Sequence, residues 1–131
     1  SAVAACAQRI RSNTPLAALT SLNEPVFVEA AQGLALRLLR EAASDDSARA
    51  RLGFQLCTSR QPTAAETAEI LKLVQHQRQR VADGWLDPRE ITTGDPAKLP
   101  ELPGDATPQD AAVWTLVSRV LLNLDETISK N

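Results

Sequence analysis

Several residue types are missing or scarce in this sequence of 131 residues. Methionine and tyrosine are absent, and aromatic side chains make up only 3% of the chain. A hydrophobic core therefore has to be built mainly from Leu, Ala and Val. No apolar run approaches the roughly 20 residues that a membrane-spanning helix needs, and Ser1 does not open the basic and long apolar segments of a signal peptide. Because position 1 is not methionine, we expect a piece of a longer protein, so the missing signal assigns no compartment.

The chain also lacks a large excess of charge of either sign. Its 14 Lys and Arg against 16 Asp and Glu leave a net charge of -2, which gives no electrostatic basis for binding nucleic acid or an anionic membrane. The stretch QHQRQR at 75–80 has two arginines but no interleaved aromatic residue. The turn at 60–63 is short enough for a helix-turn-helix, but the sequence after it, TAAETAEI, is acidic. A DNA-binding regulator is therefore disfavoured.

The chain does contain a series of helix start signals. Asn13 or Thr14 can cap a short first helix, with Pro15 in its first turn. A second start at 23–25 opens the stretch VFVEAAQGLALRLLREA. Apolar residues recur there at spacings of three and four, which is typical of an amphipathic helix. The positions expected on its buried face are Phe27, Ala30, Ala31, Leu34 and Leu38.

Three further helices are predicted downstream. Ser44-Asp45-Asp46 supplies a cap and acidic first-turn residues, and Thr63 with Glu66 forms a capping box. Thr107-Pro108 opens the last helix, in which an apolar stripe runs from Val113 to Ile128. The apolar positions of the two middle helices are Leu52, Phe54, Leu56, Ile70, Leu71, Val74 and Val81.

Residues 84–108 break this pattern. They hold five of the eight prolines and three of the five glycines, and no periodicity survives there. Trp85 and the apolar residues spaced along the segment favour an ordered loop that wraps along the helices rather than a linker. Since no stretch reads as a strand, we predict a single all-α domain over 1–131. Its four or five helices form a compact bundle with one long Pro/Gly-rich ordered loop at about 84–108.

The candidate reactive residues are few. The only histidine, His76, has no carboxylate at helical spacing and no close cysteine, so a solvent-facing helix residue is the expectation rather than a metal or triad site. Cys6 and Cys57 are either two buried thiols or a disulfide, and neither belongs to a haem-attachment or redox motif. No serine nucleophile elbow and no glycine-rich phosphate loop is present. The residues therefore predict no catalytic, cofactor or metal site in this chain.

Near the C-terminus the stretch RVLLNLDE places Asp125 beside Glu126. Adjacent helical residues are about 100° apart around the axis, so the two carboxylates cannot converge on one atom. We expect the helix to continue across them, with Arg119 and Asn123 sharing one edge at i,i+4. The alternative is a composite site that another part of a longer chain completes.

Three blocks of sequence taken together are distinctive: RSNTPLAALTSLNEPVFVEAA, QLCTSRQPTAAE and AAVWTLVSRVLLNLDETISKN. In order and spacing they resemble the C-terminal part of a planctomycete family of domains of unknown function, the PSD-one type, over nearly the whole chain. Glu24 departs from the Asp that the family more often has. The motif positions carried over are Asn13, Thr14, Pro15, Leu22, Asn23, Pro25, Phe27, Val28, Arg60, Pro62, Thr63, Glu66, Trp114, Arg119, Leu121, Leu122, Asn123, Asp125 and Glu126.

The resemblance implies a large secreted protein of which this chain is the C-terminal fragment. In such proteins a signal peptide, a cytochrome-c-like haem module and a second domain precede this part, so haem belongs elsewhere in the parent. The implied location is the periplasm or the cell surface, where a bridge between Cys6 and Cys57 would persist.

Two functional hypotheses follow. The first is a non-catalytic docking domain that packs against the N-terminal remainder of its own polypeptide or another envelope protein. The second is a subdomain that completes a composite enzyme or electron-transfer site.

Overall fold

The computed structural model describes residues 25–42, 45–95, 98 and 101–128, the last four of these for their backbone only. This part of the chain is all α-helical, as predicted, with five helices and no strand. The first helix predicted from the sequence, near Asn13, lies outside the described residues. None of the described helices is both long enough and apolar enough to cross a membrane.

The helix boundaries follow the predicted start signals. Helix α3 spans Pro25–Glu41. Helix α4 spans Asp46–Thr58, where the side chain of Asp45 caps the backbone N–H of Ser47 at 2.9 Å. Helix α5 spans Ala64–Ala82 and starts with the predicted capping box. Helix α7 spans Pro108–Ile128, and it continues across the two adjacent acids as expected.

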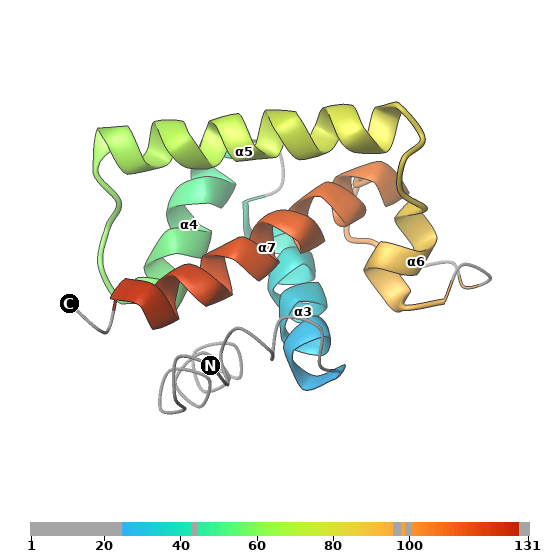
Figure 1. The fold of residues 1–131 in the computed structure, drawn as a ribbon, viewed down its shortest axis with the longest axis horizontal. Coiled ribbons are helices and arrows are strands. Elements are labelled where there is room, and N and C mark those ends of the chain that lie inside the picture. The colour runs from blue at the N-terminus through green and yellow to red at the C-terminus, as the bar shows by residue number, and fades with distance from the viewer. Residues whose placement is uncertain (1–24, 43–44, 96–97, 99–100, 129–131) are drawn as a thin grey trace.

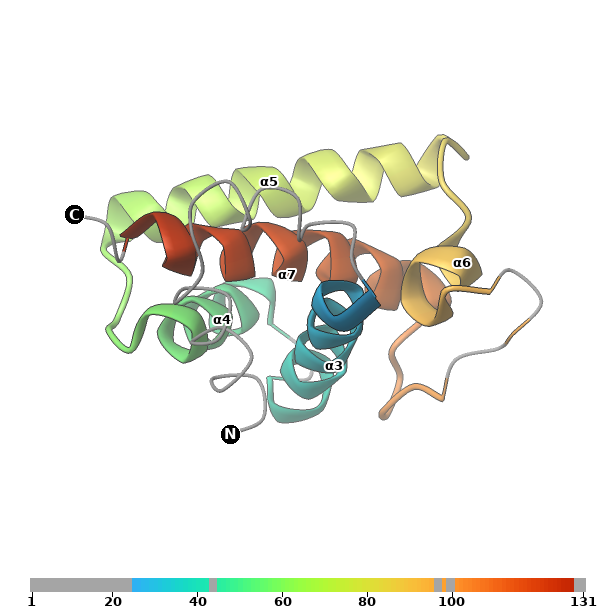
Figure 2. The same ribbon diagram turned by 60° about the horizontal axis from the view of Figure 1, so that its bottom comes forward.

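Helix α7 is the central element of the bundle and contacts each of the other four helices. Figure 1 shows α5 lying along α7 on one side, with the start of α5 near the end of α7. Helix α3 crosses α7 on another side, α4 packs near the C-terminal half of α7, and α6 lies at its opposite end (Figures 1 and 2). The chain order therefore places the last helix in the middle.

The core forms where the predicted apolar stripes meet. All five positions predicted for the buried face of α3 are buried. On α7, Trp114, Val117 and Leu121 are buried against them and against Phe54 of α4. In α4 the stripe is shifted from the prediction, because Leu52 and Leu56 are only partly buried. The short residues Ala50, Gly53 and Cys57 face the core instead and let α4 pack closely.

The segment 84–108 differs from its prediction in two ways. It contains a short helix, α6 (Pro88–Thr93), capped by Asp87 and ended by Gly94 at a positive φ of 82°. Ile91 of α6 is buried, so the segment does pack on the helices. Trp85, in contrast, is 77% exposed. The turn after α5 directs the indole to solvent, so the predicted anchoring role of Trp85 is wrong.

Candidate functional site

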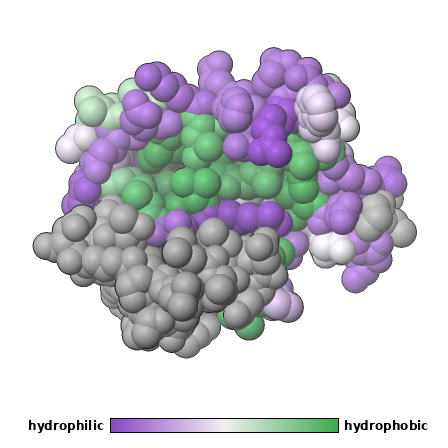
Figure 3. Space-filling view, viewed as in Figure 1, coloured by the Kyte–Doolittle hydropathy of each residue, from purple (hydrophilic) through white to green (hydrophobic). Residues whose placement is uncertain are grey.

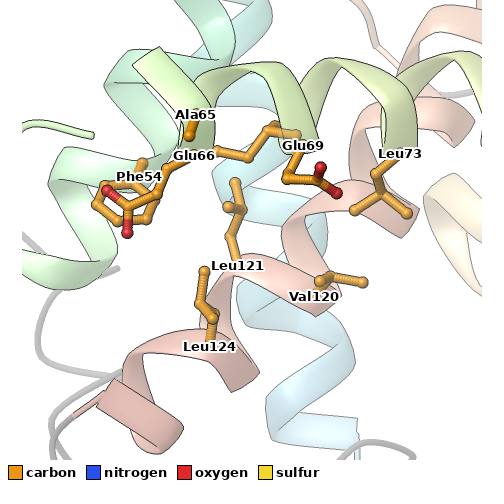
Figure 4. Close-up of a pocket in the computed structure, with 9 residues that line it drawn as sticks. Phe54, Ala65, Glu66, Glu69, Leu73, Val120, Leu121 and Leu124 are labelled. Carbon is orange, nitrogen blue, oxygen red and sulfur yellow. The ribbon is translucent and has the colours of Figure 1, made fainter. Parts of the chain in front are cut away.

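A groove with a volume of about 330 Å³ lies between the first half of α5 and the last half of α7. Figure 3 shows this face as a hollowed apolar band below the polar outer surface of α5. Figure 4 shows aliphatic side chains of both helices pointing into the groove, with Phe54 of α4 at one end. The lining residues are Phe54, Ala65, Glu66, Glu69, Ile70, Leu73, Val120, Leu121 and Leu124.

The groove exists because the apolar stripes of α5 and α7 are wider than their mutual contact. Ile70 and Leu121 are buried between the helices. Leu73 and Leu124, one turn further out, are only partly covered, and Val120 is 45% exposed. Aliphatic side chains that form one continuous exposed surface are a common feature of binding sites on soluble domains.

One end of the groove is closed by an ion pair that holds the start of α5. The guanidinium of Arg60 donates to both carboxylate oxygens of Glu66, at 2.9 and 2.7 Å. Glu66 also accepts from the backbone N–H of Thr63 at 2.8 Å, while the Thr63 hydroxyl accepts from the Glu66 N–H at 3.1 Å. Arg60 further stacks over the ring of Phe54, 4.8 Å from its centroid. Arg60, Thr63 and Glu66 thus fix the turn between α4 and α5.

These contacts set the ionisation of Glu66. The hydrogen bonds from Arg60, and then those from Thr63, lower the pKa of Glu66 to about 2. The same ion pair raises the pKa of Arg60. A carboxylate that stays ionised at neutral pH, with both oxygens engaged, is suited to a structural role. It is not suited to donating a proton in catalysis.

A second polar cluster ties α4, α5 and α7 together away from the groove. Asp46 at the start of α4 accepts from Arg78 of α5 at 2.8 and 3.3 Å, and from the buried Arg49 at 3.2 Å. The Arg78 hydrogen bond lowers the pKa of Asp46, against the opposing effect of burial. Arg49 lies over the Trp114 ring at 5.9 Å. The nearby Trp114 indole N–H makes a smaller contribution that also lowers the pKa of Asp46. The indole N–H itself has no hydrogen-bond partner in the described structure.

Arg119 and Asn123, one turn apart on α7, do not line the groove. Arg119 is partly buried, and its Nε has no hydrogen-bond partner in the described structure. Burial lowers the pKa of the Arg119 guanidinium. The group still carries its proton and its positive charge, because arginine is not deprotonated in proteins. The side chains of Asp125 and Glu126 are outside the described set. The hypothesis that these four residues form a composite site therefore stays a prediction.

The remaining predicted positions are distributed over the fold. Pro25 occupies the first turn of α3 and Pro62 precedes the cap of α5, while Trp114 is a fully buried core residue. His76 is exposed, as predicted. Cys57 is buried, and because Cys6 is outside the described residues, their bridge stays a prediction. Five motif positions also lie outside the described residues: Asn13, Thr14, Pro15, Leu22 and Asn23.

Sequence reasoning did not find the groove. Leu124 was predicted to belong to the buried stripe of the last helix, and no role was predicted for Leu73 or Val120. The sequence did hold one indication of the groove, which is the width of the apolar stripe on α7. Val120 makes this stripe wider than the surface that one neighbouring helix can cover. Nothing in the sequence pairs Asp46 with Arg78 either, because they are 32 positions apart. Among the described residues, no group of three His, Cys, Asp or Glu side chains is placed to hold a metal ion.

Comparison with known families places the first part of the chain in a family. The family model PSD1, whose description is "Protein of unknown function (DUF1553)", matches residues 1–74, which is more than half of the 131 residues. The match includes the first two sequence blocks and the Arg60–Glu66 turn. It ends before α7, so the assignment of Trp114, Arg119 and Asn123 as family positions stays a prediction. No curated protein and no solved structure matches.

Proposed function

This chain belongs to the PSD1 family of proteins of unknown function (DUF1553), and we propose that it is a non-catalytic helical docking domain. One observation carries the proposal: a continuous aliphatic groove between α5 and α7, with Val120 exposed at its edge. A soluble domain gains stability by covering such a surface with a partner. Among the described residues that line the groove there is no histidine, cysteine, serine or lysine that could act as a base or nucleophile.

The partner in this proposal is the N-terminal remainder of the same polypeptide or another envelope protein. The parent is a secreted protein of planctomycete type, associated with a cytochrome-c-like module, at the periplasm or cell surface. Sequence resemblance alone supports this setting. A bridge between Cys6 and Cys57 would support the oxidising compartment. Mass spectrometry of unreduced, freshly purified protein tests it, and two alkylatable thiols would contradict both the bridge and the compartment.

Site-specific photo-crosslinking tests the docking role. A benzophenone amino acid replaces Val120 in the protein, in the cells that make it. A matched variant carries it in place of Val26, which is 60% exposed on α3 and outside the groove. We expect crosslinks from position 120 that map to one defined peptide, in the parent polypeptide or in an envelope protein. Crosslinking from position 120 that does not exceed that from position 26 would refute the docking role.

A further inference from the structure

The shape of the groove restricts what can occupy it. Its lining on α5 runs from Ala65 to Leu73, which is about 12 Å at 1.5 Å per residue. On α7 the lining residues Val120 and Leu124 are one turn apart. Two neighbouring antiparallel helices with uncovered apolar positions at this spacing present ridges onto which a third helix packs. An amphipathic helix of two to four turns matches this surface in length and periodicity.

The edge of the groove adds a charge requirement. Glu66 is already held by Arg60, but Glu69 has only a 3.5 Å contact with Lys72, and its side chain is 74% exposed. Figure 4 shows the Glu69 carboxylate extending along the edge toward Leu73. Among the described residues that line the groove, Glu69 is thus the acidic group that remains accessible to a partner, because its pair with Lys72 is exposed on both sides. A cation on the partner complements it, whereas a carboxylate at the same place is repelled.

We propose that the α5–α7 groove binds an amphipathic helix with an aliphatic stripe and a Lys or Arg beside that stripe, opposite Glu69. The aliphatic side chains cover the partly buried Leu73 and Leu124 and the exposed Val120, and the basic side chain sets the orientation of the helix. This inference rests on the proposed docking role and specifies the chemistry of the partner.

Two synthetic helical peptides of 18 residues test the inference. Both carry a Leu/Ile stripe on an Ala/Gln background, and they differ only in one flanking residue, which is Lys in the first and Glu in the second. Fluorescence anisotropy measures the binding of each to the full 131-residue chain. We expect the Lys peptide to bind about fivefold more tightly at low salt. We expect this ratio to shrink in 0.5 M salt, because screening weakens exposed ion pairs.

Matched variants of the protein locate the binding. Glu69→Gln should bring the two peptides to nearly equal affinity. Val120→Asp should weaken both by tenfold or more, because it places a carboxylate on the aliphatic surface. Val26→Asp puts the same charge at an exposed valine of α3 outside the groove and should change neither affinity. Circular dichroism confirms that each variant is folded, which is expected because both valines are exposed.

The outcomes separate this inference from the docking role. Equal binding of the two peptides to the wild-type chain would refute the charge requirement. Binding that survives Val120→Asp would place the helix elsewhere and refute the site. Crosslinks from position 120 to a peptide without a helical apolar stripe would refute the helix but leave docking intact. A dimer in sedimentation experiments that Val120→Asp dissociates would identify a second copy as the occupant and refute the proposed partner. Absence of crosslinks from position 120 refutes docking itself.

Discussion

Replacing Gly53 by alanine probes a close contact of α4 with α3 and α7. Gly53 lies in the middle of α4, where a Cβ atom would come within 2.8 Å of the Leu121 Cδ1 and 3.2 Å of the Leu38 Cδ1. Both leucines are fully buried. The added methyl therefore has to displace side chains of α3 and α7 that are already packed. Leu121 has one direction in which to move, because it also lines the groove.

The magnitude follows from two opposing effects. Alanine is favoured over glycine inside a helix by about 0.5–1 kcal/mol. Overpacking a well-filled core costs about 1–3 kcal/mol. The net cost lies between about 0 and 2.5 kcal/mol. We expect Gly53→Ala to be destabilised by about 1 kcal/mol, and by less if Leu121 moves into the groove.

Gly33 provides the matched control. It is an exposed glycine in the middle of α3, and a Cβ there would meet nothing within 4 Å. Gly33→Ala should therefore gain the helix propensity alone and stabilise the fold by about 0.5–1 kcal/mol.

Urea unfolding followed by far-UV circular dichroism measures both variants under the same conditions. The two should differ by about 1–3 kcal/mol and fall on opposite sides of the wild type. In thermal melts this corresponds to roughly 3–5 °C for each kcal/mol in a domain of this size. If Gly53→Ala is stabilised as much as Gly33→Ala, the close approach of α4 to Leu38 and Leu121 is wrong.

Four further predictions concern individual side chains. Trp114→Ala should lower the free energy of unfolding, measured by thermal melts, by about 3 kcal/mol or more, because it removes the fully buried indole of α7. Asp125→Asn and Glu126→Gln should each lower the free energy of unfolding by about 1 kcal/mol or less. If either lowered it more than Trp114→Ala does, the acids would belong to a buried network. The carboxyl of Glu66 should titrate by NMR near pH 2 rather than at its ordinary 4.5. Because the folded pKa is the lower one, its stabilising contribution is complete above about pH 4.5 and is lost as the pH falls toward 2; a midpoint near 4.5 would contradict the ion pair. Trp85→Phe removes the indole that is 77% exposed and leaves only the buried Trp114 to fluoresce. The emission should therefore be blue-shifted relative to the wild type and should resist quenching by acrylamide. Quenching equal to that of the wild type would show that Trp85 is covered.

The sequence predicted the helices well because their signals are local. The Thr63–Glu66 capping box, the Asp45 cap and the Pro108 start each involve residues within one turn of each other, and each appears in the structure as predicted. The stripe of α3 was predicted correctly for the same reason, since it follows from periodicity alone. Prediction failed where a residue depends on a distant neighbour. Trp85 was expected to pack because it is aromatic, but the turn after α5 leaves it in solvent.

By itself, then, the sequence determined the all-α class, the starts of α3, α4, α5 and α7, and membership of a family whose model covers residues 1–74. Only the tertiary structure decided that α7 occupies the centre and that Asp46 pairs with Arg78 across 32 positions. It also decided that Val120 remains exposed beside a groove while Leu121 is buried. The physical reason is that a helix forms through contacts three and four residues apart. Which part of its apolar stripe stays uncovered depends on the crossing of neighbouring helices, which no local pattern encodes.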